Sequence, residues 1–67
     1  MVVYIGIEYD YDGTDVRGVF ESLEEAQDFS KKYNYNISIL EYETKGNRFL
    51  AEYDYSKVEN IWYCSGR

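Results

Sequence analysis

The residues with the clearest chemical potential are two aspartates, Asp10 and Asp12, which flank Tyr11 directly after an apolar segment. Carboxylates can act as nucleophiles or as general acids and bases. Asp15 adds a third carboxylate, so the same loop offers oxygen donors of the kind that Ca²⁺ prefers. The Asp-Gly pair at Asp12 is also typical of a tight hairpin turn, which requires no chemistry at all.

Asp10-Tyr11-Asp12-Gly13-Thr14 resembles the D-x-D-G-T signature of the haloacid-dehalogenase-like phosphatases. In that family the first Asp is the nucleophile, the second is the acid/base, and remote lysine and acidic residues complete a Mg²⁺ site. The family's motif closes the first strand of a parallel α/β domain well over twice the length of this chain. Here a short strand follows, and the chain has no room for the remaining parts. We therefore interpret the motif as a hairpin turn and expect no catalytic residue.

The usual residues of metal and redox sites are also missing. The chain contains no histidine, and Cys64, its one cysteine, has no partner for an intramolecular disulfide. A full twelve-residue calcium loop with its terminal bidentate glutamate is absent, so we expect no metal site there; weak cation binding in the millimolar range is the minor alternative. We expect no cofactor, no zinc site and a reducing compartment.

Charge and length limit the classes of partner. Thirteen acidic side chains against seven Lys and Arg give a net charge of −6, which repels phosphate backbones and favours a basic partner. The apolar residues 1–7 lack a basic leading region and meet Glu8 at once. We therefore expect no signal peptide, no membrane span and no nucleic-acid binding, and we expect a cytoplasmic protein.

The hydrophobic pattern predicts a single α+β domain over residues 1–67, with a four-stranded antiparallel sheet in the order ββαββ and one amphipathic helix packed on one face. Alternation predicts a hairpin of strands Val2–Tyr11 and Val16–Phe20 and a second of Tyr35–Thr44 and Arg48–Tyr55, joined by turns at Asp12-Gly13-Thr14 and Lys45-Gly46-Asn47.

The helix between the hairpins has a clear start signal. Ser22-Leu23-Glu24-Glu25 is a capping box, and Lys31-Lys32 suit the negative end of the helix dipole about three turns later. Ser56-Lys57-Val58-Glu59 is a second possible capping box. Residues 57–64 therefore form either a short C-terminal helical turn or an edge strand.

One helix covers only one face of such a sheet, and the other face must meet water or another molecule. Large apolar side chains occur on both sides of the predicted strands: Ile37 and Ile39 lie on one side, and Leu40 and Tyr42 lie on the other. Nine tyrosines and one tryptophan exceed what so small a core can hold, and tyrosine is common at interfaces. We expect this surface either to bind a protein partner or to form a homodimer. The predicted partner-binding residues are Tyr9, Asp10, Tyr11, Tyr42, Glu52, Tyr53, Asp54, Tyr55 and Trp62.

Acidic residues and tyrosines alternate most clearly in Glu8-Tyr9-Asp10-Tyr11, which recurs as Glu52-Tyr53-Asp54-Tyr55. We interpret the recurrence as shared strand chemistry and not as a duplication. Rows of carboxylates on paired strands could imitate the phosphate spacing of a nucleic acid and occupy a basic groove on a host enzyme. The alternative is an acidic surface that only solvates the domain.

Gly18-Val19-Phe20-Glu21-Ser22-Leu23-Glu24-Glu25-Ala26 resembles a strand-to-helix pattern, G-V-F-x-S-x-E-E-A, of small acidic proteins that phages and prophages encode. The resemblance spans about half the chain and implies an accessory protein that inhibits a host enzyme or an antiviral defence system in the host cytoplasm. It assigns no functional residues. The predicted function is a small acidic protein-binding module, an inhibitor or adaptor; the alternative is a homodimeric structural or regulatory domain without catalytic activity.

Overall fold

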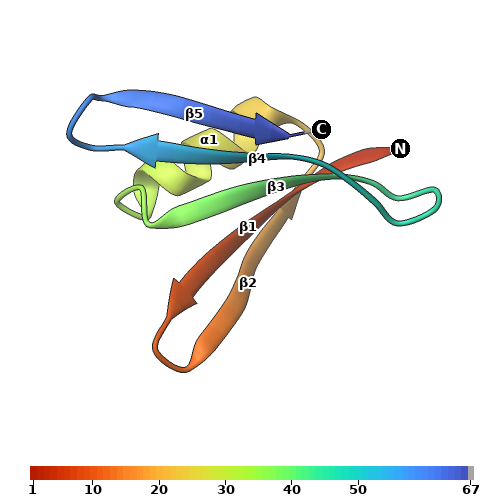
Figure 1. The fold of residues 1–67 in the computed structure, drawn as a ribbon, viewed down its shortest axis with the longest axis horizontal. Coiled ribbons are helices and arrows are strands. Elements are labelled where there is room, and N and C mark those ends of the chain that lie inside the picture. Colours follow the sequence, from red (N-terminus) through yellow and green to blue (C-terminus); the bar gives the residue numbers. More distant parts are fainter. Residues whose placement is uncertain (67) are drawn as a thin grey trace.

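A five-stranded antiparallel sheet carries one helix on one of its faces in the computed structural model, which describes residues 1–66 (Figure 1). The strands lie side by side in the order β2-β1-β3-β4-β5, so β2 and β3 flank β1 and the helix crosses from one to the other. The elements are β1 (Val2–Asp10), β2 (Gly13–Phe20), α1 (Leu23–Lys32), β3 (Ile37–Glu43), β4 (Arg48–Ser56) and β5 (Ile61–Gly66). The predicted α+β class is confirmed, and the predicted count of four strands is one too few.

The predicted capping box starts helix α1. Ser22 is its N-cap and its hydroxyl oxygen accepts a hydrogen bond from the Glu25 amide at 3.2 Å. The helix ends because Asn34 and Tyr35 take left-handed backbone angles, with φ of 63° and 59°. The Tyr35 amide then donates to the Ser30 carbonyl at 2.7 Å, which closes the last turn and delays the start of β3 to Ile37.

Two paired glycines allow the helix to approach the sheet closely. Gly6 of β1 lies opposite Gly18 of β2, and a Cβ at Gly18 would stand 2.7 Å from the ring of Phe20. The Phe20 ring therefore occupies the space that a side chain at Gly18 would take, and its centroid lies 5.2 Å from that of Phe29 on the helix. The core is correspondingly small: Ala26, Ile37, Ile39 and Ala51 are the buried apolar side chains among residues 1–66.

The fifth strand resolves the two alternatives for the C-terminal segment. The Ser56 hydroxyl accepts from the Glu59 amide, as the second capping box predicted, but the segment does not continue as a helix. Asn60 takes a left-handed φ of 61° and its amide donates to the Ser56 carbonyl at 2.7 Å, which reverses the chain over residues 57–60. Residues Ile61–Gly66 then pair antiparallel with β4 as an edge strand.

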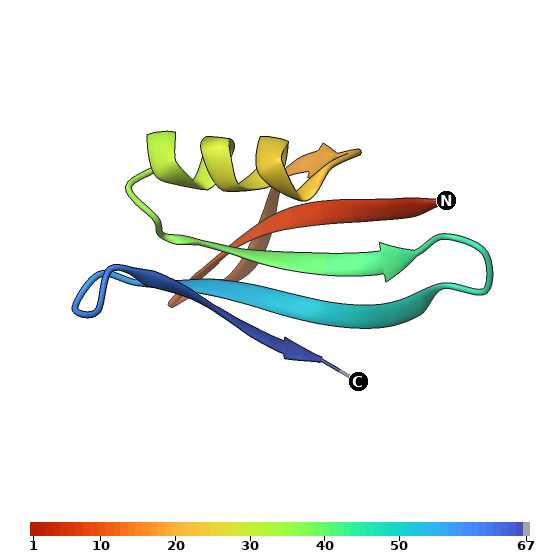
Figure 2. The same cartoon turned by 90° about the horizontal axis from the view of Figure 1, so that it is seen from above.

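The helix contacts β1, β2 and β3 and leaves the opposite face of the sheet without any covering element of the described chain (Figure 2). Side chains directly opposite one another on paired strands lie on the same face, so the register identifies which residues belong to each face. The face toward the helix includes Gly6, Phe20, Ile37 and Ile39.

Candidate protein-binding surface

The candidate site is the face of the sheet that the helix does not cover. We call it the open sheet face, and the register places these residues on it: Val3, Ile5, Ile7, Tyr9, Thr14, Val16, Val19, Ser38, Leu40, Tyr42, Phe49, Glu52, Asp54, Tyr63 and Ser65. Val16 and Val19 have exposed fractions of 63% and 61%.

The more apolar side of β1 is the side that points away from the helix. Val3, Ile5 and Ile7 lie on the open sheet face, whereas Gly6 and Glu8 of the same strand lie toward the helix. A Cβ at Gly6 would lie 3.1 Å from the Cγ2 methyl of Ile37 on β3, so a side chain there would have to displace this core residue. The aliphatic side chains of β1 lie on the opposite, uncovered face.

Polarity changes across the open sheet face along two rows that run perpendicular to the strands. One row passes from Val19 through Ile5 and Leu40 to Glu52. The next passes from Val16 through Ile7 and Ser38 to Asp54, and the Ser38 hydroxyl donates to Asp54 Oδ1 at 2.5 Å. Both rows thus begin with valine on β2 and reach a carboxylate on β4, and beyond it Ser65 and Tyr63 of the edge strand β5 lie opposite Glu52 and Asp54.

Glu52 and Asp54 form an acidic pair where these rows cross β4. Hydrogen bonding with Asp54, partial burial and the negative charge of Asp54 together raise the pKa of the Glu52 carboxyl. Partial burial, followed by the charges of Glu52 and Asp54, also raises the pKa of the Tyr9 phenol. Both groups experience a local excess of negative charge.

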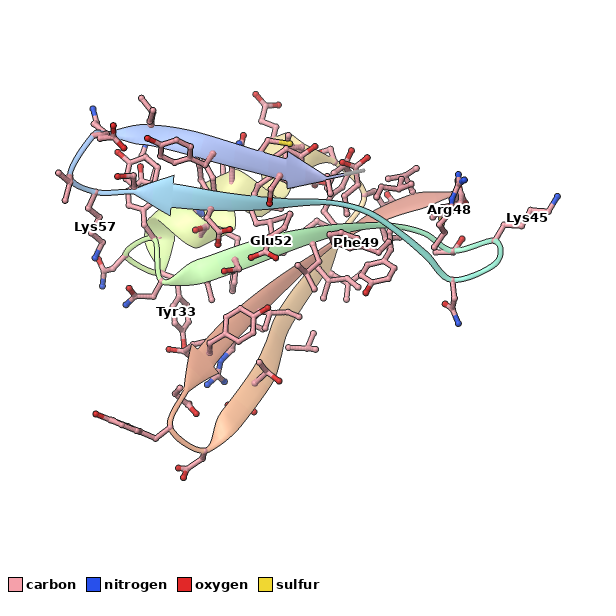
Figure 3. All side chains as sticks on the ribbon, in the orientation of Figure 1. Tyr33, Lys45, Arg48, Phe49, Glu52 and Lys57 are labelled. Atoms are coloured by element: carbon pink, nitrogen blue, oxygen red, sulfur yellow. The ribbon has the colours of Figure 1, made fainter. Side chains whose placement is uncertain are left out.

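The cations of the described chain lie elsewhere. Arg17 binds Glu8 at 2.9 Å and Asp15 at 3.4 Å, and the N-terminal ammonium binds Glu43 at 2.7 Å. Lys45 and Arg48 lie at one end of the sheet and Lys57 at the other, away from Glu52 near its middle (Figure 3). Among residues 1–66, no ion pair includes Glu52 or Asp54.

The tip of the first hairpin extends the surface. Tyr9, Asp10 and Tyr11 line a shallow, open depression at this tip. The Tyr11 side chain is fully exposed. Asp10 Oδ1 accepts a hydrogen bond from the Asp12 amide at 2.9 Å, so this carboxylate stabilises the turn, as the hairpin interpretation of the motif predicted. Within residues 1–66, no group of three or more acidic or cysteine side chains is arranged to hold a metal ion.

Three of the predicted partner-binding residues lie on the other face. Tyr53 lies toward the helix side and its hydroxyl donates to Glu41 Oε1 at 2.6 Å. Tyr55 and Trp62 lie beyond the helix and pack with Tyr35, whose ring centroid is 3.7 Å from that of Tyr55. This aromatic cluster links the end of the helix to β4 and β5, and its three rings pack against one another.

The two Glu-Tyr-Asp-Tyr segments therefore present opposite chemistry. In β1 the tyrosine Tyr9 lies on the open sheet face and Glu8 lies toward the helix. In β4 the carboxylates Glu52 and Asp54 lie on the open sheet face, and the tyrosines lie toward the helix. The predicted residues Tyr9, Tyr42, Glu52 and Asp54 are brought together, whereas Tyr53, Tyr55 and Trp62 are not.

The sequence-based prediction missed the aliphatic residues of this surface. Ile5, Ile7, Val16, Val19 and Phe49 all lie on the open sheet face, and Phe49 packs edge-on to Tyr42 with ring centroids 5.6 Å apart. Gly6 was the available signal, since a glycine inside a strand indicates the side on which another element approaches closely.

No family model, no curated protein and no solved structure matches the chain. In the part of the chain that the structure describes, no helix has the length and apolarity that crossing a membrane requires.

Proposed function

We propose that this chain is a small acidic protein-binding module that takes a partner protein on the open sheet face. The observation that carries the proposal is the orientation of β1, whose aliphatic side chains Val3, Ile5 and Ile7 lie on the uncovered face of the sheet. An apolar sheet face of this kind is more stable when another surface excludes water from it.

The size of the face suits a specific protein interface. Five strands about 4.8 Å apart and roughly 25 Å long give a footprint on the order of 600 Å². Side-chain relief adds to that figure, and a standard interface buries about 800 Å² on each partner. Aromatic side chains at Tyr9 and Tyr42 and carboxylates at Glu52 and Asp54 border the aliphatic centre, an arrangement typical of interfaces.

The biological role that we propose is inhibition or adaptation of a host or defence-system protein in the host cytoplasm. The net charge of −6 and the acidic border of the face favour a basic surface on that protein. The phage-type role is supported by the resemblance of Gly18–Ala26 to small phage and prophage proteins. Binding of this kind requires no catalytic group.

The proposal is tested by quantitative affinity capture with three baits. The double substitution Val16→Gln, Val19→Gln makes two exposed positions of the open sheet face polar, and Val58→Gln changes a still more exposed valine in the β4–β5 turn. We expect wild type and Val58→Gln to capture the same proteins and the double variant to lose them. Urea denaturation confirms that all three baits are folded. Equal capture by all three would refute the proposal.

A further inference from the structure

We infer that the segment that docks on the open sheet face is apolar and carries an arginine, whose guanidinium binds between Glu52 and Asp54. The inference rests on the proposed function and specifies its partner: a basic, apolar segment of another protein and not a second copy of this chain.

The first argument is the uncompensated charge on β4. Glu52 and Asp54 are two residues apart on one face of a strand, and Ser38 donates to only one of their oxygens. Carboxylates this close repel one another when both are ionised, and hydrogen bonding with Asp54, partial burial and the Asp54 charge raise the pKa of the Glu52 carboxyl. A cation from outside would relieve the repulsion, and the ion pairs within residues 1–66 supply none.

The second argument is what surrounds the pair. Leu40 lies directly opposite Glu52, and Tyr9 lies close enough for Glu52 and Asp54 to affect its pKa. An arginine has an apolar stem and a planar head with a fork of donors. The stem fits against Leu40 and the Tyr9 ring, while the head reaches both carboxylates. Lysine would place a more strongly hydrated point charge there, with less contact to the ring.

The third argument is the order of chemistry across the sheet. Each row runs from valine on β2 to a carboxylate on β4, which spans three inter-strand spacings, or about 14 Å. A partner segment that crosses the strands from β2 therefore meets aliphatic side chains first, then the acidic pair, and beyond it Ser65 and Tyr63 of β5. Its apolar residues and its arginine must lie within that span of one another.

A second copy does not meet this requirement. The residues that the register assigns to the open sheet face include no Lys or Arg, and each copy has a net charge of −6. A two-fold dimer through this face would bring Glu52 and Asp54 of both copies into one interface without a cation. Buried charge without a partner is strongly unfavourable, so the charges select a basic partner over self-association.

The test uses a phage-displayed library of random peptides as the probe. The library is panned against three proteins: wild type, the open-face charge variant (Glu52→Gln with Asp54→Asn) and the helix-side charge variant (Glu21→Gln with Asp28→Asn). The helix-side variant removes the same charge from exposed positions. We expect wild type and the helix-side variant to enrich peptides that combine aliphatic or aromatic residues with arginine. The open-face charge variant should lose the enrichment in arginine.

One enriched peptide and its Arg→Gln form then complete a double-mutant cycle by fluorescence anisotropy. Losing the arginine or losing the two carboxylates should each weaken binding about tenfold, and losing both should weaken it little further. Equal affinities of the Arg and Gln peptides for wild type would overturn the inference. If Val16→Gln, Val19→Gln still abolished binding in that case, the proposed function would stand.

Two other outcomes would overturn the inference. If peptides bind wild type and Val16→Gln, Val19→Gln equally, the open sheet face is not the docking surface, and the proposed function fails together with the inference. If wild type sediments as a dimer that Val16→Gln, Val19→Gln dissociates, a second copy covers the face and the homodimer is correct.

Discussion

Truncating neighbouring residues of β3 should reveal how unequal the two faces of the sheet are. Ile39 is fully buried between the sheet and the helix, whereas Leu40 lies on the open sheet face and is only partly buried. Replacing either residue with alanine removes the same three carbons. At about 0.8 kcal/mol for each buried carbon, Ile39→Ala loses about 2.4 kcal/mol of transfer free energy, and the cavity raises the total to roughly 3–4 kcal/mol.

Leu40→Ala should cost only about 1 kcal/mol, because its side chain is already partly in water and leaves no enclosed cavity. A 67-residue domain has a free energy of unfolding of roughly 3–10 kcal/mol, so the first substitution removes a large part of the stability and the second a small part. Urea denaturation at 25 °C, followed by far-UV circular dichroism, measures both losses. Equal losses, or a larger loss for Leu40→Ala, would refute the assignment of the two faces.

Three further substitutions test local interactions. Ser22→Ala removes the N-cap of the helix and should cost about 1 kcal/mol in the same urea assay, with no loss meaning that the cap contributes nothing. The hydrogen bond to Glu41 and partial burial raise the pKa of the Tyr53 phenol, so the folded state holds that proton more tightly than the unfolded state. The resulting stability is complete below about pH 10 and is lost at higher pH. Thermal melts should therefore show that Tyr53→Phe loses less stability between pH 9 and pH 11 than wild type. The raised pKa of the Glu52 carboxyl gives stability that is complete below the ordinary pKa of 4.5 and is lost as pH rises through the folded value. Glu52→Gln should therefore be more stable than wild type at pH 7. A less stable variant would show that Asp54 does not repel the Glu52 carboxylate.

Local signals in the sequence predicted the elements well. The helix was predicted from the Ser22–Glu25 capping box and the first turn from Asp12-Gly13, because side-chain hydrogen bonds and left-handed backbone angles are properties of short segments. The C-terminal segment stayed ambiguous for a related reason. Its capping hydrogen bond at Ser56 forms in the structure, yet the left-handed angle at Asn60 turns the chain back into a strand.

The surface was harder to predict, because it depends on register and on which face the helix takes. A bulge between Glu41 and Tyr42 shifts the pairing, so that Phe49 and Ala51, which simple alternation places together, lie on opposite faces. The two Glu-Tyr-Asp-Tyr segments have identical residues and opposite orientation for the same reason: each strand's register is set by its neighbours and not by its own sequence.

Site-specific photocrosslinking tests the central claim most directly. A benzoylphenylalanine introduced at position 19 lies on the open sheet face, and one at position 28 lies on the exposed side of the helix. In host lysate, we predict a discrete crosslinked adduct from position 19 and none from position 28. The double substitution of Glu52→Gln with Asp54→Asn should diminish the adduct from position 19. An adduct from position 28 alone would contradict the account and would place the partner on the helix side of the molecule.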